Sequence, residues 1–397
     1  MPGLRRALLA FVLAAVAFAV VALSARDANA HPWMIRHGYS ACQTCHYDPS
    51  GAGILTSYGH VIETLVLPTG PDDQSEEDKA GFLLNAVKLP EWLALDGDAR
   101  ALWLRTKVPG AKITDELILM QADAQAGIQT GKFVAAGSVG YAQRGALGAA
   151  ITRDVENNVV SRQHWLGYSL ASDRLLLRFG RMNLPFGIRT VEHNLWVRAR
   201  SRTTINDDQQ YGLSAFFSTE TWRAEVMAII GNFQLRPDDY RERGYSGYAE
   251  WMATPKLGLG VSSLVTHRDR DTVTLKETWR QTHGAFARWA TGWDPLVVQT
   301  EWDYVLVSSK DEFHRKGLVS FTQADLEPVK GLHLLATAEL SNVGTQKRYW
   351  GYGGWLSFWW FFMPHADVRL DAIYQSQGAV GGRFDTLTFL LQGHVSL

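Results

Sequence analysis

Along most of the chain, apolar and polar residues alternate one by one. In the segment 116–130, Met120 and Ala122 fall on one face, whereas Gln121 and Asp123 fall on the other. A period of two is that of a β-strand with one apolar face and one wet face. The same pattern recurs over 295–308 and 364–376, so we expect a fold built from such strands.

About sixteen segments show this alternation, which is typical of strands in outer-membrane barrels. We therefore predict an all-β fold, a roughly 16-stranded antiparallel outer-membrane β-barrel preceded by a small N-terminal segment. The expected strands are 92–106, 116–130, 131–145, 160–171, 174–182, 208–218, 221–231, 243–254, 257–268, 279–290, 295–308, 315–326, 331–342, 349–360, 364–376 and 384–397.

The links between these strands alternate in length. After each even-numbered strand the link is tight, as at Gly131, Ser172-Asp173 and Pro255-Lys256, whereas the longest link follows an odd-numbered strand and runs over 183–207. Short periplasmic turns and longer outer loops are typical of bacterial outer-membrane barrels. An even number of strands places both ends of the barrel chain on the periplasmic side.

A soluble β-sandwich or propeller is the alternative fold, but a sandwich would turn a polar face to water, and no propeller repeat is visible. Aromatic residues near the strand ends favour a barrel with two interfacial girdles. The tryptophans in question are Trp92, Trp103, Trp222, Trp251, Trp279, Trp289, Trp293, Trp350 and Trp359.

The N-terminus is typical of an export signal. Arg5 and Arg6 precede an apolar run, and Ala28-Asn29-Ala30 offers a cleavage site. We predict a signal peptide over 1–30, with an uncleaved anchor as the alternative. No later apolar run approaches eighteen residues, so we expect no spanning helix.

The mature chain divides into three further parts. Residues 31–68 contain the only two cysteines, 69–91 form a linker with an acidic, Pro/Gly-containing stretch, and 92–397 form the barrel. The formal net charge of −1 indicates no nucleic-acid partner.

The two cysteines lie in the motif Cys42-Gln43-Thr44-Cys45-His46. Cys-x-x-Cys-His spacing is typical of covalent c-type haem attachment, with two thioethers and the histidine as iron ligand. We expect one covalent haem c bound by Cys42, Cys45 and His46. A local disulfide or a redox dithiol is the alternative.

A second axial ligand is needed unless the haem iron is five-coordinate. The candidates near the motif are His60, His37, Met34 and His31. His60 is the first choice, because the glycines at 51–53 allow the chain to turn back across the macrocycle. Met34 and His37 follow, and the sequence leaves the choice open.

Charged residues of both signs occupy the inward positions of the predicted strands. A lysine ladder is absent, which counts against phosphate transport. The inward residues are Asp96, Asp98, Arg100, Asp123, Arg178, Arg223, Glu225, Glu250, Arg288, Glu301, Asp303, Glu339, Asp367, Arg369 and Asp371. Acidic and histidine side chains in outer loops are candidates for weak Fe(II) binding. They are Glu192, His193, Asp207, Asp208, Asp238, Asp239, His267 and Asp269.

Two stretches resemble known families. Residues 177–187, LRFGRMNLPFG, are similar to a stretch of phosphate-selective-type porins, and 39–60, with CQTCH and LTSYGH, resemble the haem region of fused monohaem cytochrome c–porins. In that family one c-type haem module precedes a barrel, and the best-known members are outer-membrane iron oxidases. Those members have phenylalanine and arginine where Tyr58 and His60 stand here.

The resemblance implies electron transfer through one haem, between an extracellular redox partner and a periplasmic c-type cytochrome. Fe(II) is the expected donor, which would make the activity of the iron(II):cytochrome c oxidoreductase type, although the sequence permits flow in either direction. The haem is expected at the periplasmic side or in the lumen of a barrel in the outer-membrane lipid. A diffusion porin with a tethered haem plug or sensor is the alternative.

Overall fold

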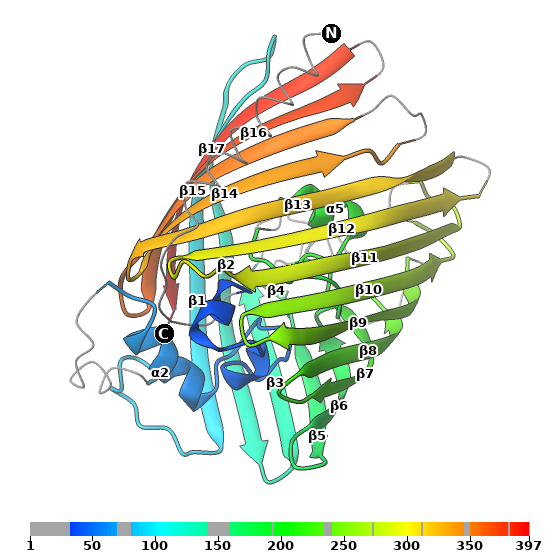
Figure 1. Cartoon of the computed structure of the whole chain (residues 1–397). Helices are drawn as coiled ribbons and strands as arrows, with labels where there is room; N and C mark the ends of the chain where they lie inside the picture. The colour runs from blue at the N-terminus through cyan, green and yellow to red at the C-terminus, as the bar shows by residue number, and fades with distance from the viewer. Residues whose placement is uncertain are drawn as a thin grey trace.

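A computed structural model gives the fold of the chain (Figure 1). It describes residues 32–69, 81–141, 159–192, 194–205, 207–233, 240–271, 274–310, 313–344, 350–379 and 382–396. The predicted signal peptide lies outside these residues, as does most of the acidic stretch of the predicted linker.

Antiparallel strands make up most of the chain, and adjacent strands in the sequence pair with each other. Their bounds are β1 Leu93–Lys107, β2 Thr114–Thr130, β3 Phe133–Tyr141, β4 Val159–Val160, β5 His164–Leu170, β6 Leu175–Met182, β7 Gln210–Ser218, β8 Trp222–Gly231, β9 Glu242–Thr254, β10 Leu257–Arg268, β11 Thr278–Ala290, β12 Leu296–Ser309, β13 Phe313–Val329, β14 Leu332–Ser341, β15 Gly351–Met363, β16 Ala366–Ala379 and β17 Gly382–Ser396.

The sheet closes on itself, because β1 pairs with β2 on one side and with β17 on the other. β4 and β5 both pair with β3 and are two pieces of one strand, so the closed barrel has 16 strands. The predicted fold class is confirmed. Closure leaves no sheet edge with unpaired backbone groups, as a bilayer requires.

Tight turns join the strands at one end of the barrel, which we call the short-turn end. The predicted turns at Pro255-Lys256 and Ser172-Asp173 are confirmed. Two others lie a few residues later than expected, at 330–331 and 364–365, because β13 and β15 each continue past a register shift near their ends. In outer-membrane barrels the end with short turns faces the periplasm.

The two faces of the strands differ as the alternation predicts. In β14, inward residues are buried and outward residues are exposed in strict succession. The outer face is apolar, with Leu117 77 % exposed and Leu356 68 % exposed. An outward apolar band is the surface that a barrel presents to lipid.

Most of the predicted girdle tryptophans lie on the outer face, and Trp222 stacks with Trp251 across neighbouring strands, with ring centroids 6.3 Å apart. Trp359 differs, because it is buried and its indole N–H donates to Asp367 inside the barrel (2.7 Å). Its neighbour Trp360 takes the outward position, being 40 % exposed.

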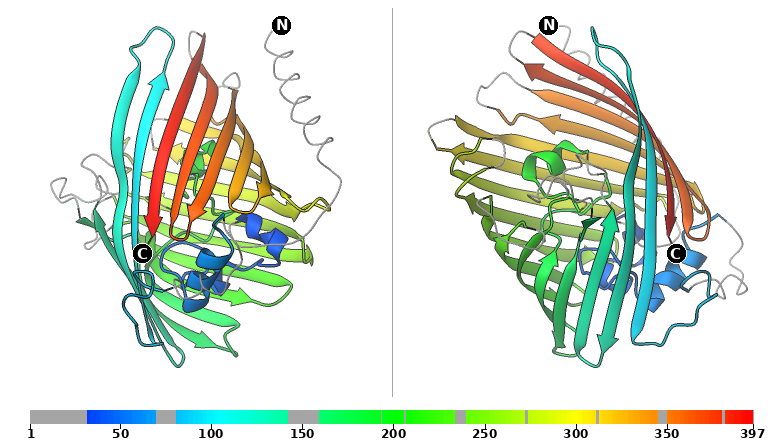
Figure 2. Two further views of the ribbon diagram at one scale, coloured as in Figure 1. Left: turned by 90° about the vertical axis from the view of Figure 1, so that its left-hand side faces the viewer. Right: turned by 180° about the vertical axis from the view of Figure 1, so that it is seen from behind.

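Residues 32–69, which we call the N-terminal segment, lie inside the barrel toward the short-turn end (Figure 2). They form two short 3₁₀ helices, η1 (Pro32–His37) and η2 (Cys42–Thr44), and one α-helix, α2 (Ser57–Leu65). The hydroxyl of Thr56 accepts a hydrogen bond from the amide of Gly59 (3.0 Å) and caps α2. Two apolar clusters join the segment to the wall, one containing Trp33 and Met34, the other Tyr47 and Ile54.

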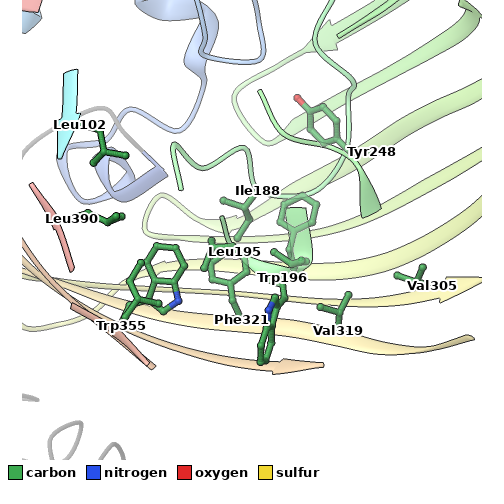
Figure 3. Packing of buried hydrophobic residues seen from close by; sticks show 13 residues of the cluster. Leu102, Ile188, Leu195, Trp196, Tyr248, Val305, Val319, Phe321, Trp355 and Leu390 are labelled. Atoms are coloured by element: carbon green, nitrogen blue, oxygen red, sulfur yellow. The ribbon is translucent and has the colours of Figure 1, made fainter. Parts of the chain in front are cut away.

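Residues 183–209, which we call the luminal loop, join β6 to β7. The sequence predicted an outer loop here, but the loop folds into the barrel. The loop contains α5 (Trp196–Ser201), and its apolar side chains pack against the inner wall (Figure 3). Leu195 and Val197 are fully buried there. Burial of these apolar side chains explains the inward path, since an outer position would leave them in water.

No helix among the described residues is both long and apolar enough to cross a membrane.

The lipid-facing surface can be tested by placing a charge at two depths. Leu356→Arg, near the middle of β15, is expected to cost about 2–4 kcal/mol of folding free energy in a bilayer. Val329→Arg, at the last residue of β13, should cost about 0–1 kcal/mol. Urea titrations of folding into lipid vesicles measure both values, and equal costs at the two depths would contradict the proposed membrane position.

Candidate functional site

The Cys-x-x-Cys-His motif lies in the part of the N-terminal segment that lines a cavity within the barrel. The amide of His46 donates to the carbonyl of Cys42 (3.0 Å), so that the motif forms one compact turn. The ring Nδ1 of His46 lies 3.1 Å from the carbonyl oxygen of Gly53. Only an Nδ1–H can donate to a carbonyl, and this tautomer leaves the Nε2 lone pair available to a metal.

Burial lowers the pKa of His46, which keeps the ring neutral, as iron ligation requires. Burial, with a smaller effect from Cys42, raises the pKa of the Cys45 thiol to about 12. Redox-active dithiols have lowered thiol pKa values, so this environment does not favour that alternative. No disulfide joins the two cysteines in this structure.

Three glycines shape the turn around the motif. Gly51 and Gly53 have φ of +81° and +73°, values that side-chain-bearing residues rarely adopt. Gly59 lies where α2 crosses the motif, and a Cβ there would stand 2.1 Å from the carbonyl oxygen of Cys45. The positive φ of Gly51 and Gly53 gives the turn that the sequence predicts at these glycines.

A cavity of about 440 Å³ opens beside the motif and continues into the lumen. Cys42, Cys45 and His46 all line it, together with residues of the wall and of the luminal loop. The volume lies within the range of binding sites for small molecules and cofactors. The motif residues therefore line a cavity with the volume of a cofactor site.

The candidates for the second iron ligand differ in their relation to this cavity. Met34 is buried and lines it, whereas His60 and His37 are not among the lining residues. The Nδ1 of His60 faces Glu63 at 3.8 Å. Nε2 of His37 accepts from Arg36 (3.2 Å), and burial, with the nearby charges of Arg36 and Lys256, lowers its pKa to about 3. His31 lies outside the described residues.

Two cavity-lining histidines come from the far end of the sequence and were not predicted. His365, in the turn between β15 and β16, lies 3.4 Å from a carboxylate oxygen of Glu63. Burial acts to raise the pKa of Glu63, but His365 and His60 outweigh it and hold the pKa below its usual range. His394 is held at both ring nitrogens by Asp98 (3.1 Å) and Asp367 (2.6 Å).

Buried ion pairs fix the N-terminal segment to the wall. Arg178 pairs with Asp48 of the segment at 2.9 Å and also with Glu225 of β8, and all three side chains are buried. Arg178 belongs to the porin-like stretch identified in the sequence. Arg36 pairs in the same way with Glu327 near the end of β13. The inward positions predicted for Arg178 and Glu225 are confirmed.

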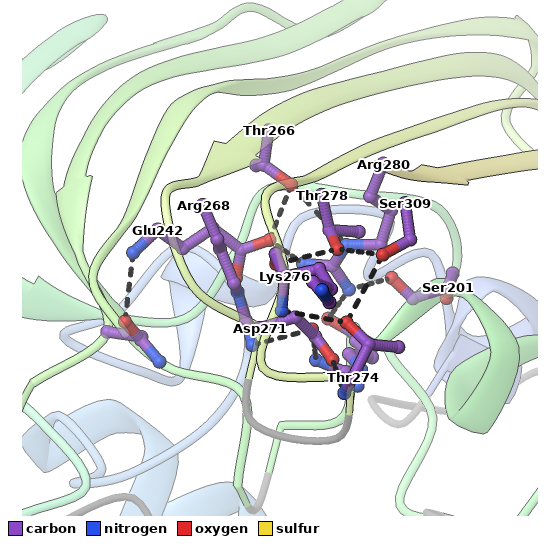
Figure 4. Close-up of polar contacts among 12 residues, drawn as sticks. Ser201, Glu242, Thr266, Arg268, Asp271, Thr274, Lys276, Thr278, Arg280 and Ser309 are labelled. Carbon is purple, nitrogen blue, oxygen red and sulfur yellow. Dashed lines mark hydrogen bonds and ion pairs between the residues drawn. The ribbon is translucent and has the colours of Figure 1, made fainter. Parts of the chain in front are cut away.

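The luminal loop is held from the wall at several heights. Arg198 of α5 pairs with Glu301, and the amide of Ile188 donates to the same carboxylate (2.7 Å). Nearer the long loops, Arg268 and Arg280 share Glu242, and Arg280 donates to the carbonyl of Ser201 (2.7 Å), as Figure 4 shows. These contacts place the loop across the lumen as a fixed element.

The proposed Fe(II) residues do not gather into one site. Glu192 lies inside the barrel, contrary to the prediction, because it pairs with Arg369 at 2.8 Å. His267 lies between Glu277 (3.1 Å) and Asp269 (3.8 Å), and Asp269 also pairs with Arg243. His193, Asp238 and Asp239 lie outside the described residues. Within the described ranges, no three His, Cys, Asp or Glu side chains are placed to hold a metal ion.

The Arg178 contacts can be tested by substitution. Arg178→Ala leaves two buried carboxylates without their cation, and breaking a buried pair in this way costs about 3–5 kcal/mol. We expect lower thermal stability and faster proteolysis of residues 32–69 in the folded protein. Arg105→Ala, which breaks an exposed pair with Asp115, should change neither measurement appreciably. Equal sensitivity of the two variants would contradict an anchoring role for Arg178.

No protein-family model and no curated protein matches the chain. Solved structures do match. OmpT, an outer membrane protein of Vibrio cholerae (trimer form), is 10 % identical with a TM-score of 0.57, over 77 % of this chain and 99 % of that chain. The anion-selective porin from Comamonas acidovorans gives the same four values. The outer membrane channel DcaP of Acinetobacter baumannii is 11 % identical with a TM-score of 0.51, over 77 % of this chain and 97 % of that chain.

At these identities the likeness is one of fold alone. The matched structures agree with a closed antiparallel barrel over 77 % of this chain. The chain therefore has the porin-like β-barrel fold of bacterial outer-membrane proteins.

Proposed function

We propose that the chain is an outer-membrane cytochrome–porin that carries one covalent c-type haem and passes electrons between an extracellular partner and a periplasmic c-type cytochrome. The observation that carries the proposal is the position of the Cys42–His46 motif, which lines a cavity inside the barrel. Cys42 and Cys45 would hold the haem through thioethers, and His46 would bind the iron through Nε2. A bound haem would supply one-electron iron chemistry.

The position of the N-terminal segment in the barrel supports this proposal. The N-terminal segment enters the lumen from the short-turn end, where a soluble periplasmic cytochrome would have access. Tyr58 of α2 is 45 % exposed, and its hydroxyl contacts that of Tyr39. Tyr39 also packs against the apolar cluster that contains Cys45.

Fe(II) is the proposed extracellular donor. The residues at the long-loop end that would meet it, such as His267 and Glu277, are already engaged in ion pairs. We therefore propose an outer-sphere encounter with no dedicated iron-binding site at the surface. The same arrangement would serve an extracellular acceptor with reversed electron flow.

A diffusion porin with a tethered haem plug is the second candidate, and the porin-like barrel fold supports it. The luminal loop and the N-terminal segment both occupy the lumen, and their buried ion pairs hold them there. A fixed filling of this kind reduces the free cross-section for solutes. The reduced cross-section favours electron transfer over solute diffusion as the function.

Covalent haem is the first test. The purified mature protein should gain the mass of one haem and stain for covalent haem, and Cys42→Ala/Cys45→Ala should lose both signals. Gln43→Ala, at a variable position of the motif, is the matched control and should keep them. An unmodified wild-type mass from a host that matures c-type cytochromes would refute the haem proposal.

Stopped-flow mixing of the holoprotein separates the two candidate functions. We expect Fe(II) to reduce the haem and a periplasmic cytochrome c to reoxidise it, with little single-channel conductance in planar bilayers. Large conductance, together with a haem that exchanges electrons with neither partner, would favour the porin.

The second iron ligand gives a separate prediction. We propose Met34, because its thioether is buried and lines the same cavity as His46. Met34→Ala should abolish the methionine-to-iron charge-transfer band of the oxidised protein and lower the haem potential, since methionine ligation raises it. His60→Ala should leave that band in place. Loss of axial ligation in the His60 variant alone would instead identify His60 as the ligand.

A further inference from the structure

Six arginines line the cavity, and five of them have a carboxylate partner. Arg100 pairs with Asp98, Arg162 with Asp123, Arg223 and Arg288 with Glu250, and Arg369 with Glu192 and Asp371. Arg189, in the luminal loop, differs from the others. Among the described residues it forms no ion pair, and its buried Nη1 has no hydrogen-bond partner.

The surroundings of Arg189 are well defined. Its guanidinium carbon lies 4.5 Å from the ring centroid of Tyr248, so that the aromatic face supports the cation. The charged and titratable groups that face it are Tyr248 and Glu250 of β9, Glu225 of β8 and Cys42 of the motif. Glu250 is already paired with Arg223 and Arg288. Glu225 is already paired with Arg178. The cation beside Cys42 therefore has no carboxylate of its own.

A guanidinium taken out of water needs a charged hydrogen-bonding partner, and a carboxylate fits its fork of donors best. The other five arginines of this cavity each have such a carboxylate partner within the protein. The partner of Arg189 is accordingly expected to come from the molecule that occupies the cavity. A c-type haem carries two carboxylates, its propionates.

We infer that Arg189 is the anchor for a carboxylate of the cavity's occupant, namely a propionate of the haem attached to Cys42 and Cys45. This inference rests on the proposed function. It makes Arg189 a positioning residue for the haem, with Tyr248 holding the guanidinium from behind. A free anion such as inorganic phosphate offers the same chemistry and is the competing source.

The test compares Arg189→Gln with Arg223→Gln in the holoprotein. Arg223 is the matched control, because it lines the same cavity and its loss removes the same charge, but Glu250 keeps Arg288 as a partner. The haem midpoint potential is measured by spectroelectrochemical titration between about pH 5 and pH 8, near the range in which a propionate without a cationic partner takes up a proton.

In the wild type, the Arg189 cation keeps the propionate ionised, so the potential should not depend on pH over this range. In Arg189→Gln the propionate should take up one proton with each electron near neutrality, which makes the potential rise as pH falls. Arg189→Lys should restore most of the pH independence. Arg223→Gln should shift the potential without making it depend on pH.

Two results would overturn the inference while the proposed function stands. The first is covalent haem in all variants with the same pH dependence in Arg189→Gln and Arg223→Gln. The second is Arg189-dependent binding of inorganic phosphate to the Cys42→Ala/Cys45→Ala protein, measured calorimetrically, together with a holoprotein Arg189→Gln that titrates like the wild type. Absence of covalent haem from the wild-type chain would refute the proposed function, and the inference with it.

Discussion

The pairing of β1 with β17 is the constraint on which the rest of the structure depends. A bilayer offers no partners to backbone amides and carbonyls, so a sheet within it must close. Closure turns one face of every strand to lipid and the other to a confined lumen. The alternation of apolar and polar residues, the exposed apolar belt and the concentration of charge inside all follow from that division.

The lumen then has to satisfy many charged side chains at once. Ion pairs that link different parts of the chain satisfy these charges. The N-terminal segment and the luminal loop each form at least one ion pair with the wall. Asp48 brings the N-terminal segment to Arg178, and Arg198 brings the luminal loop to Glu301. Because such pairs are costly to break singly, the segment, the loop and the wall form one polar framework around the cavity.

The sequence predicted the strands well because lipid on one face and the polar lumen on the other impose an alternation of apolar and polar residues that is visible locally. It also identified the Cys42–His46 motif and the turn at Gly51 and Gly53, since both depend on local residue types.

What it missed depends on contacts between distant residues. His365 meets Thr64 and Glu63 across some three hundred residues, and no local pattern marks it. The inward path of the luminal loop was open to prediction, since Leu195-Trp196-Val197 is too apolar for an outer loop. Trp359 and Trp360 could not be told apart by type, and only the register of β15 decides which faces lipid.

The contact between Ser396 and Glu63 has a consequence for the order of folding. These residues are separated by 333 positions, and Thr69 similarly meets Phe361 at the short-turn end. Contacts between the two ends of a chain have the highest loop-closure cost and slow the step that forms them. The N-terminal segment thus completes its contacts only when the last strand is in place, and the interior and the closing seam of the barrel form together.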